Sequence, residues 1–117
     1  MGDTFQFSVH NPAEAEMDIT GVYIVNPSNP DDYINAVEND TVNFDLVSVD
    51  IWVGVKNIGE EAGTATVTLK DGSDNILETK DVSIGAGSEV SVTLDSSGAH
   101  YEIPDGETKT FKAEVTP

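Results

Sequence analysis

The sequence is notable first for what it lacks. It contains no cysteine and no arginine, and its five lysines stand against 22 aspartates and glutamates, for a net charge of −17. Without cysteine, the fold cannot rely on disulfides or thiolate metal sites. No apolar run approaches the ~20 residues needed to cross a bilayer, so we expect no membrane insertion by this segment. A chain this acidic repels phosphate backbones, which excludes nucleic acid as a natural partner.

The acidic residues are spread along the chain rather than gathered in a tail, which indicates a solvated surface on all sides. Association with cations, or with a basic protein surface, suits such a chain. A second interpretation is environmental, since dense carboxylates with few lysines keep a protein hydrated where concentrated salt screens self-repulsion. The composition is similar to that of halophilic proteins.

A period of two dominates the hydrophobic pattern of the 117 residues, 38% of which are hydrophobic. That content and length suit one domain, 1–117, with a core of its own. Alternation predicts half-buried strands whose apolar faces are Phe5, Phe7 and Val9; Val47, Val49, Ile51, Val53 and Val55; Ala65, Val67 and Leu69; Val90, Val92 and Leu94; and Phe111, Ala113 and Val115. The segment 19–25 is apolar on both faces, so we expect it to be central or covered. Residues 11–18 and 29–40 are led by proline, and loops or single turns are expected there.

Turn signals separate these segments, and KDGSDN (70–75) is expected to close a hairpin. Two similar phrases, IGAGSEVSVTL from Ile84 and IPDGETKTFKA from Ile103, predict tight turns with positive φ at Gly87 and Gly106. VENDTVNF (37–44) is a looser third version, with Asn-Asp in place of the glycine. Seven or eight strands without helical crossovers predict an all-β fold, an antiparallel immunoglobulin-like β-sandwich.

One stretch has a family resemblance. A strand ending VKN-G, a short acidic loop, a strand ending at DG and a return strand through IGAGSEVSVTL resemble the CARDB type of domain, and IPDGETKTFKAEV is similar to its last hairpin. CARDB domains are cell-adhesion-related, immunoglobulin-like modules of bacterial and archaeal surface proteins. The resemblance covers 47–115; residues 1–46 are less family-like. It implies a non-enzymatic, extracellular structural or adhesion module of a larger cell-surface protein, in contact with a protein partner or neighbouring domains of its parent chain.

A second resemblance is to the soluble domains of archaeal surface-appendage subunits and accessory proteins, in which an acidic β-sandwich follows a membrane helix. This alternative predicts assembly with other subunits. Any export signal or anchor is expected to belong to a longer parent chain.

The residues favour no catalytic chemistry. His10 and His100 lack a recognisable third metal ligand, and no GxSxG elbow places a serine nucleophile. We therefore expect no enzyme, no catalytic residue, no metal and no cofactor. The DGSDN segment (71–75) offers oxygen ligands for Ca²⁺, but a plain hairpin turn uses the same residues, and the turn is favoured.

Trp52 is the candidate partner-contact residue. If Val49 and Val53 face the core, period two directs Trp52 outward, where it is either covered by the N-terminal third or left free for a partner. The covered interpretation is favoured. The free one supports a further alternative, a carbohydrate-binding module using Trp52 with Tyr23, Tyr33 or Tyr101. Asn39 begins an NDT sequon and is the candidate glycosylation site.

Overall fold

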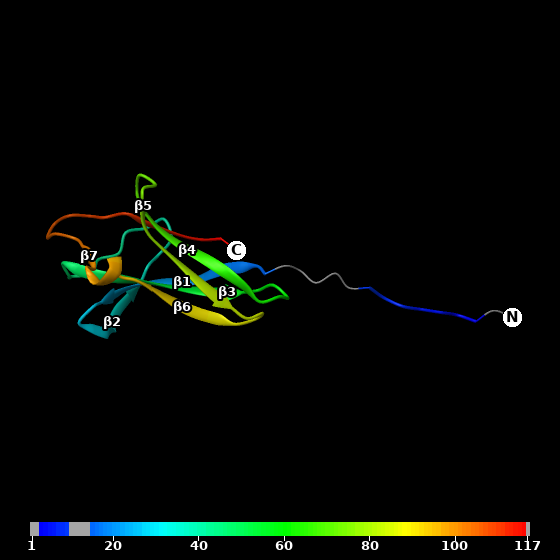
Figure 1. The fold of residues 1–117 in the computed structure, drawn as a ribbon. Helices are drawn as coiled ribbons and strands as arrows, with labels where there is room; N and C mark the ends of the chain where they lie inside the picture. The colour runs from blue at the N-terminus through cyan, green and yellow to red at the C-terminus, as the bar shows by residue number, and fades with distance from the viewer. Residues whose placement is uncertain (1–2, 10–14, 117) are drawn as a thin grey trace.

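The computed structural model describes residues 3–9 and 15–116, and the strands within them form two antiparallel sheets (Figure 1). The elements are β1 (Met17–Asn26), β2 (Asn29–Asn35), β3 (Ser48–Asn57), β4 (Gly63–Asp71), β5 (Ile76–Ile84), β6 (Glu89–Leu94), the short 3₁₀ helix η1 (Ser96–Gly98), β7 (Tyr101–Glu102) and β8 (Phe111–Thr116). The predicted β-sandwich of seven or eight strands is confirmed, with eight strands.

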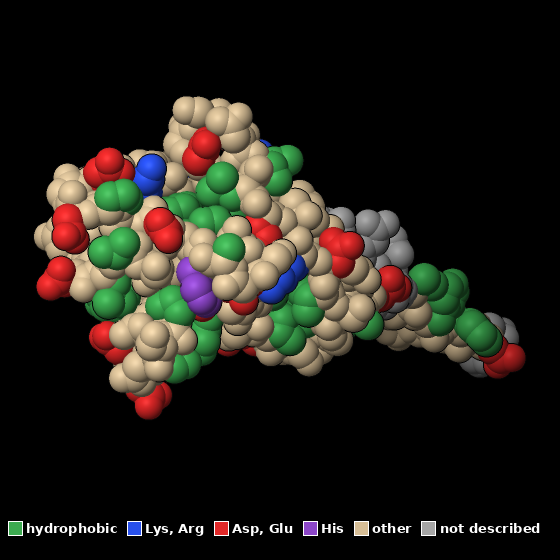
Figure 2. All heavy atoms as spheres, turned by 60° about the vertical axis from the view of Figure 1, so that its left-hand side comes forward, with side chains coloured by type: hydrophobic (Ala, Val, Ile, Leu, Met, Phe, Trp, Pro, Cys, Tyr) green, Lys and Arg blue, Asp and Glu red, His purple; other side chains and the backbone are tan. Residues whose placement is uncertain are grey.

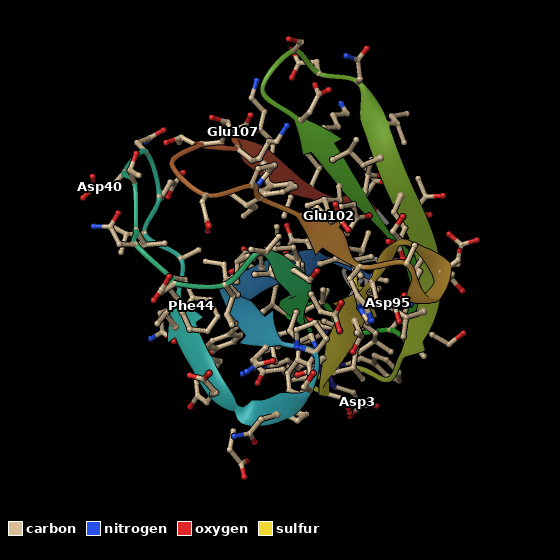
Figure 3. All side chains as sticks on the ribbon, turned by 90° about the vertical axis from the view of Figure 1, so that its left-hand side faces the viewer. Asp3, Asp40, Phe44, Asp95, Glu102 and Glu107 are labelled. Atoms are coloured by element: carbon tan, nitrogen blue, oxygen red, sulfur yellow. The ribbon has the colours of Figure 1, made fainter. Side chains whose placement is uncertain are left out.

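The larger sheet has the order β2-β1-β3-β6, with β7 also pairing with β3, and the smaller sheet has the order β5-β4-β8. Viewed along the strands, the two sheets form separate layers (Figure 3). The layers are in contact at both sides, where β5 approaches β6 and β8 approaches β1. The hairpin predicted at 70–75 joins β4 to β5, and the predicted central position of segment 19–25 is confirmed, since β1 lies between β2 and β3.

The core is closed most tightly around the two middle strands. On β3, the inward residues Val49, Ile51, Val53 and Val55 are 0–2% exposed, and on β4, Ala65, Val67 and Leu69 are all 0% exposed. Period two therefore identified these faces correctly. Val47 is an exception: it is 47% exposed because it precedes the first residue of β3 and does not share its pleat.

The expectation of a loop or turn at 29–40 is wrong in its first half, because Asn29–Asn35 forms β2. This strand pairs with β1 through a turn at Pro27 and Ser28. It lies at the edge of its sheet, where Pro30 can be accommodated and where acidic side chains stay in water. Weak strand propensity is here overridden by pairing with an apolar neighbour.

The strand predicted at residues 5–9 is also wrong as a member of a sheet. Residues 3–9 lie outside both sheets and project from one end of the sandwich (Figure 1). Their alternation is that of a strand, but a strand needs a hydrogen-bonding neighbour, and no strand of the described chain pairs with them. Half of segment 11–18 lies outside the described residues, and so does His10.

The repeated phrase has one structural meaning. In each version, a backbone N–H donates to the carbonyl three residues earlier: Ser88 to Gly85, Glu107 to Pro104, and Asp40 to Val37. The third residue of each turn has positive φ, at Gly87 (73°), Gly106 (78°) and Asn39 (60°). This is the pattern of a type II turn, and asparagine is the residue other than glycine that best tolerates the left-handed region. The predicted turns are confirmed.

Candidate functional site

The segment 3–9, which we call the N-terminal arm, is strongly amphipathic. Phe5, Phe7 and Val9 are 88%, 73% and 84% exposed. The rings of Phe5 and Phe7 lie edge to face with centroids 6.0 Å apart, as expected for residues on one face of an extended chain. Hydrophobic side chains accordingly gather on the projecting arm (Figure 2). Exposed apolar surface of this kind is typical of interaction sites.

The sandwich has a matching open edge at β8. In the described chain, β8 pairs with β4 alone, and no other backbone hydrogen bond reaches its residues. Its inward side chains Phe111, Ala113 and Val115 pack against the core but stay partly exposed, whereas Ala65, Val67 and Leu69 on β4 are fully buried. The inward face of β1 is partly exposed as well, at Met17, Ile19, Val22 and Ile24. We call this region, β8 with the adjoining face of β1, the β8 edge.

The other side of the sandwich is closed by side chains that bridge the layers. Lys80 of β5 donates to the backbone carbonyl of Thr93 on β6. Glu78 Oε1 accepts from the backbone N–H of Ser96 at 2.7 Å and from the hydroxyl of Tyr101 at 2.6 Å. The free edge of β2, by contrast, is blunted by Pro30 and by two exposed carboxylates, Asp31 and Asp32. The β8 edge has no proline, and its two exposed charges, Lys112 and Glu114, are of opposite sign and are ion-paired with Asp74 and Lys70.

Most of the polar side chains at the η1 end serve the fold. Burial, followed by the hydrogen bond to Glu78, raises the pKa of Tyr101 above its ordinary value of 10.0. His100 Nδ1 lies 2.6 Å from Asp50 Oδ1, and Asp50 is only 9% exposed. His100 itself has a positive φ of 63°. These pairs fix the segment between β6 and β7 onto β3 and β5.

Trp52 is partly buried on the outer face of the larger sheet, between the inward residues Ile51 and Val53, which confirms its outward direction. Cover by the N-terminal third stays a prediction. Tyr23 of β1 lies directly opposite it across the strand pair. Tyr33 of β2 lies opposite Val25, diagonally from Tyr23, and its ring meets that of Tyr23 edge to face, with centroids 5.7 Å apart and ring planes at 86°. Tyr101 does not join this group, because it pairs with Val49 and packs against the core.

The motif VKN-G owes its asparagine to the fold. Asn57 is 0% exposed, and its Oδ1 accepts from the N–H groups of Glu16 (3.2 Å) and Gly59 (3.0 Å). Its Nδ2 donates to the carbonyls of Glu61 (2.7 Å) and Ile84 (3.1 Å). Four bonds from one side chain join the start of β1, the β3–β4 loop and the end of β5. Sequence inspection noted the motif without finding this role.

The DGSDN segment has the bonds of a hairpin turn. The side-chain amide of Asn75 donates to Asp71 Oδ2, and the backbone N–H groups of Asn75 and Ser73 donate to Asp71 Oδ1. These bonds, led by the side-chain one, lower the pKa of Asp71 below its ordinary value. Asp74 is held by Lys112 at 2.7 Å, which lowers the pKa of Asp74. Within residues 3–9 and 15–116, no group of three or more acidic or histidine side chains is arranged to hold a metal ion.

Two sequence predictions remain, the glycosylation candidate Asn39 and the absence of membrane insertion. Asn39 is exposed at the tip of its turn, where the amide is accessible. No helix in the described part of the chain is long and apolar enough to cross a membrane. The arm and the β8 edge were both missed as a site, although the arm's alternation was visible, because a sequence pattern does not identify the partner of a strand.

Comparison of the chain with protein-family models, with curated proteins and with solved structures finds no match.

Proposed function

We propose that this chain is a non-enzymatic structural module of a larger cell-surface protein, and that its work is to join neighbouring chains or domains. The observation that carries the proposal is the exposed amphipathic arm beside a sandwich whose edge strand β8 pairs with β4 alone in the described chain. Both features are complementary to a β-strand partner, and strand addition is a common mode of protein assembly. A pure spacer between domains needs neither feature.

The alternative of a surface-appendage subunit belongs to the same class and shares this support. Assignment to the immunoglobulin-like CARDB type, and with it the extracellular location, is supported by the resemblance of residues 47–115. The acidic surface is compatible with that location, because a charge of −17 keeps a display module hydrated and prevents nonspecific aggregation.

Antibody labelling of intact cells tests the proposed location. An antibody raised against the folded chain should label intact cells of the source organism as strongly as permeabilised ones. Labelling that requires permeabilisation would overturn the extracellular assignment. A cytoplasmic protein detected in the same cells provides the control for membrane integrity.

Carbohydrate binding is a second candidate because Tyr23 of β1 lies opposite Trp52 of β3 and contacts Tyr33 of β2 diagonally. Tyr33 is 52% exposed, as a stacking residue must be. However, sugar stacking favours coplanar aromatic rings, and the planes of Tyr23 and Tyr33 are close to perpendicular. A glycan array probed with the native chain and with Tyr33→Ala tests this candidate. Binding that is lost in the variant would establish it over the structural proposal.

A further inference from the structure

We propose that the N-terminal arm of one copy adds as a fourth strand to the β8 edge of a second copy. The inference rests on the proposed assembly function and deepens it by naming the two surfaces that meet. It makes the partner another copy of this chain. In the assembled state, the arm, which pairs with no strand of its own sandwich, would pair with β8 of the second copy.

The arm has the length and pattern that β8 requires. Its seven residues, 3–9, compare with the six residues of β8. Apolar side chains at Phe5, Phe7 and Val9 repeat with the same period as those at Phe111, Ala113 and Val115. Paired in phase, the arm directs its apolar face toward β1 and its polar residues Thr4, Gln6 and Ser8 toward water.

The β8 edge has room for such a strand because the two sheets are unequal. The larger sheet extends past β1 to β2, whereas the smaller sheet stops at β8, which approaches β1. The inward side chains of β1 and β8 are therefore partly exposed, while those of β3 and β4 are not. At one end of the sandwich, the loop carrying Asp40 and Phe44 reaches from β2 to the turn that carries Glu107 and leads into β8 (Figure 3). The arm would approach from the opposite end, from which it also projects (Figure 1).

Charge favours the same edge. Two copies of a chain with net charge −17 repel each other over most of their surface. Three of the five lysines, Lys70, Lys109 and Lys112, lie on β4, on β8 or just before β8. The arm itself carries one acidic residue, Asp3, and no basic one among its described residues. These lysines are ion-paired with Glu114, Glu107 and Asp74, so the β8 edge is neutral rather than basic. On β8 itself Lys112 balances Glu114, whereas the edge strand β2 carries Asp31 and Asp32 and no basic residue, so a second copy meets less repulsion at β8 than at β2.

Sedimentation velocity of the full chain over a range of concentrations, in moderate salt, measures association. We expect the native chain to associate, and Phe5→Ser/Phe7→Ser to raise the dissociation constant by about tenfold or more, the scale of lost aromatic hot spots. The matched control, Thr4→Ser/Gln6→Ser, changes the opposite face of the arm and should associate like the native chain. Both variants lie outside the sandwich and should melt like the native monomer.

Cross-linking between two labelled chains identifies the surfaces, since the native chain has no cysteine. A Gln6→Cys chain mixed with a Glu114→Cys chain should give a mixed cross-linked dimer with a short bismaleimide. A Gln6→Cys chain mixed with an Asp32→Cys chain, which tests the β2 edge, should give little. A chain carrying Gln6→Cys and Glu114→Cys together, diluted until it is monomeric, should show no internal cross-link.

The outcomes separate the inference from the function on which it rests. Association that is unchanged in Phe5→Ser/Phe7→Ser, or cross-linking to β2 in place of β8, overturns the inference and leaves an assembly function standing. A chain that stays monomeric with its own arm cross-linked to its own β8 also overturns it. A monomer whose arm contacts neither edge also overturns the inference. The proposed location is overturned only by the antibody experiment, if labelling requires permeabilised cells.

Discussion

Asn57 shows how a single polar side chain can hold three separate segments of this fold. It is fully buried, and all four of its hydrogen-bonding positions are used on backbone groups. Three of those groups, at Glu16, Gly59 and Glu61, lie outside the strands, and the fourth is at Ile84, the last residue of β5. A buried backbone group without a hydrogen-bonding partner destabilises the fold. The Asn57 side chain supplies these partners where the hydrogen bonds between strands end.

Asn57→Ala should lower the free energy of unfolding by about 3 kcal/mol, because it leaves several buried backbone groups unpaired at about 1–3 kcal/mol each. Urea unfolding followed by tryptophan fluorescence measures the loss. The control is Asn75→Ala, whose amide makes one exposed bond to Asp71 and should cost less than about 1 kcal/mol. Equal unfolding midpoints for the two variants would contradict the role assigned to Asn57.

Gly106→Ala should lower the free energy of unfolding by about 1 kcal/mol, because a side chain is strained at its φ of 78° although nothing lies within 4 Å of the added carbon. Gly85→Ala is the matched control, since Gly85 begins the equivalent turn without a positive φ and its added carbon meets Ser88 at an ordinary 3.5 Å. Thermal melts compare the two. A Gly106→Ala chain as stable as native would remove strain as the reason for glycine in the repeated phrase.

At the level of elements, the two sides of the sandwich are held differently. On the β5–β6 side, Glu78 gathers bonds from η1 and β7 and Lys80 reaches β6, so the layers are linked by polar contacts as well as by the core. On the β1–β8 side, the contact is apolar and partly open. Mobility and assembly are therefore expected on the β8 side, and stability on the other.

Tyr101→Phe tests the closed side. At neutral pH it should lower the free energy of unfolding by about 1.5 kcal/mol, the scale of a hydrogen bond to a charged group. Because the folded-state pKa of Tyr101 is raised, the folded protein favours the neutral phenol. The stability this provides is complete below the unfolded-state value near 10.0 and declines as pH rises above it. The difference in the free energy of unfolding between the native chain and Tyr101→Phe, measured in urea, should thus shrink above pH 10.0. A difference that stays constant with pH would contradict the role of the Tyr101 hydroxyl.

The element scale also shows what the sequence could predict. Alternation located β3, β4, β6 and β8 because their apolar faces are buried against the opposite layer, as at Val53 and Val67. It missed β2, whose residues are mostly exposed and whose strand form depends on pairing with β1. It placed the arm in a sheet because Phe5 and Phe7 alternate like core residues. The alternation of apolar and polar residues identifies the two faces of a strand. It does not identify the neighbouring strand that completes its hydrogen bonds.

The polar contacts were beyond prediction for a related reason. Asp50 and His100 are 50 positions apart, and Glu78 and Tyr101 are 23 apart, so only the folded topology brings them together. The turn at 71–75 could be predicted because its bonds are local, between Asp71 and residues two and four positions later. Hydrogen bonds between residues close in the sequence could therefore be predicted, and contacts between the two sheets could not.

For the whole molecule, the dominant property is the net charge of −17. Few of the 22 acids are neutralised: in the described chain, lysine pairs reach Glu114, Glu78, Glu107 and Asp74. Most of the remaining carboxylates are exposed on the surface (Figure 2). Folding gathers these like charges into a smaller volume, and the expanded chain relieves their repulsion.

Salt should therefore raise the melting temperature. The Debye length falls from about 30 Å at 0.01 M to about 3 Å at 1 M, so most of the gain should arrive below molar salt. NaCl and KCl should act alike, because screening depends on ionic strength. CaCl₂ at matched ionic strength should add little, since no described acidic group is arranged as a metal site. A calcium effect that saturates at millimolar concentration would instead reveal a bound ion, which stabilises the native state by mass action.

The same melts must separate screening from association, because salt also weakens the repulsion between copies and would favour strand addition. The Phe5→Ser/Phe7→Ser chain keeps all 22 acids and lacks the apolar arm face, so its melting temperature should rise with salt as much as that of dilute native chain. At high protein concentration, the native chain alone should gain further, and that gain should grow with concentration as linked assembly requires. A melting temperature flat in all three salts would defeat the screening argument. A concentration-dependent gain that persists in the double variant would show that copies associate without the arm.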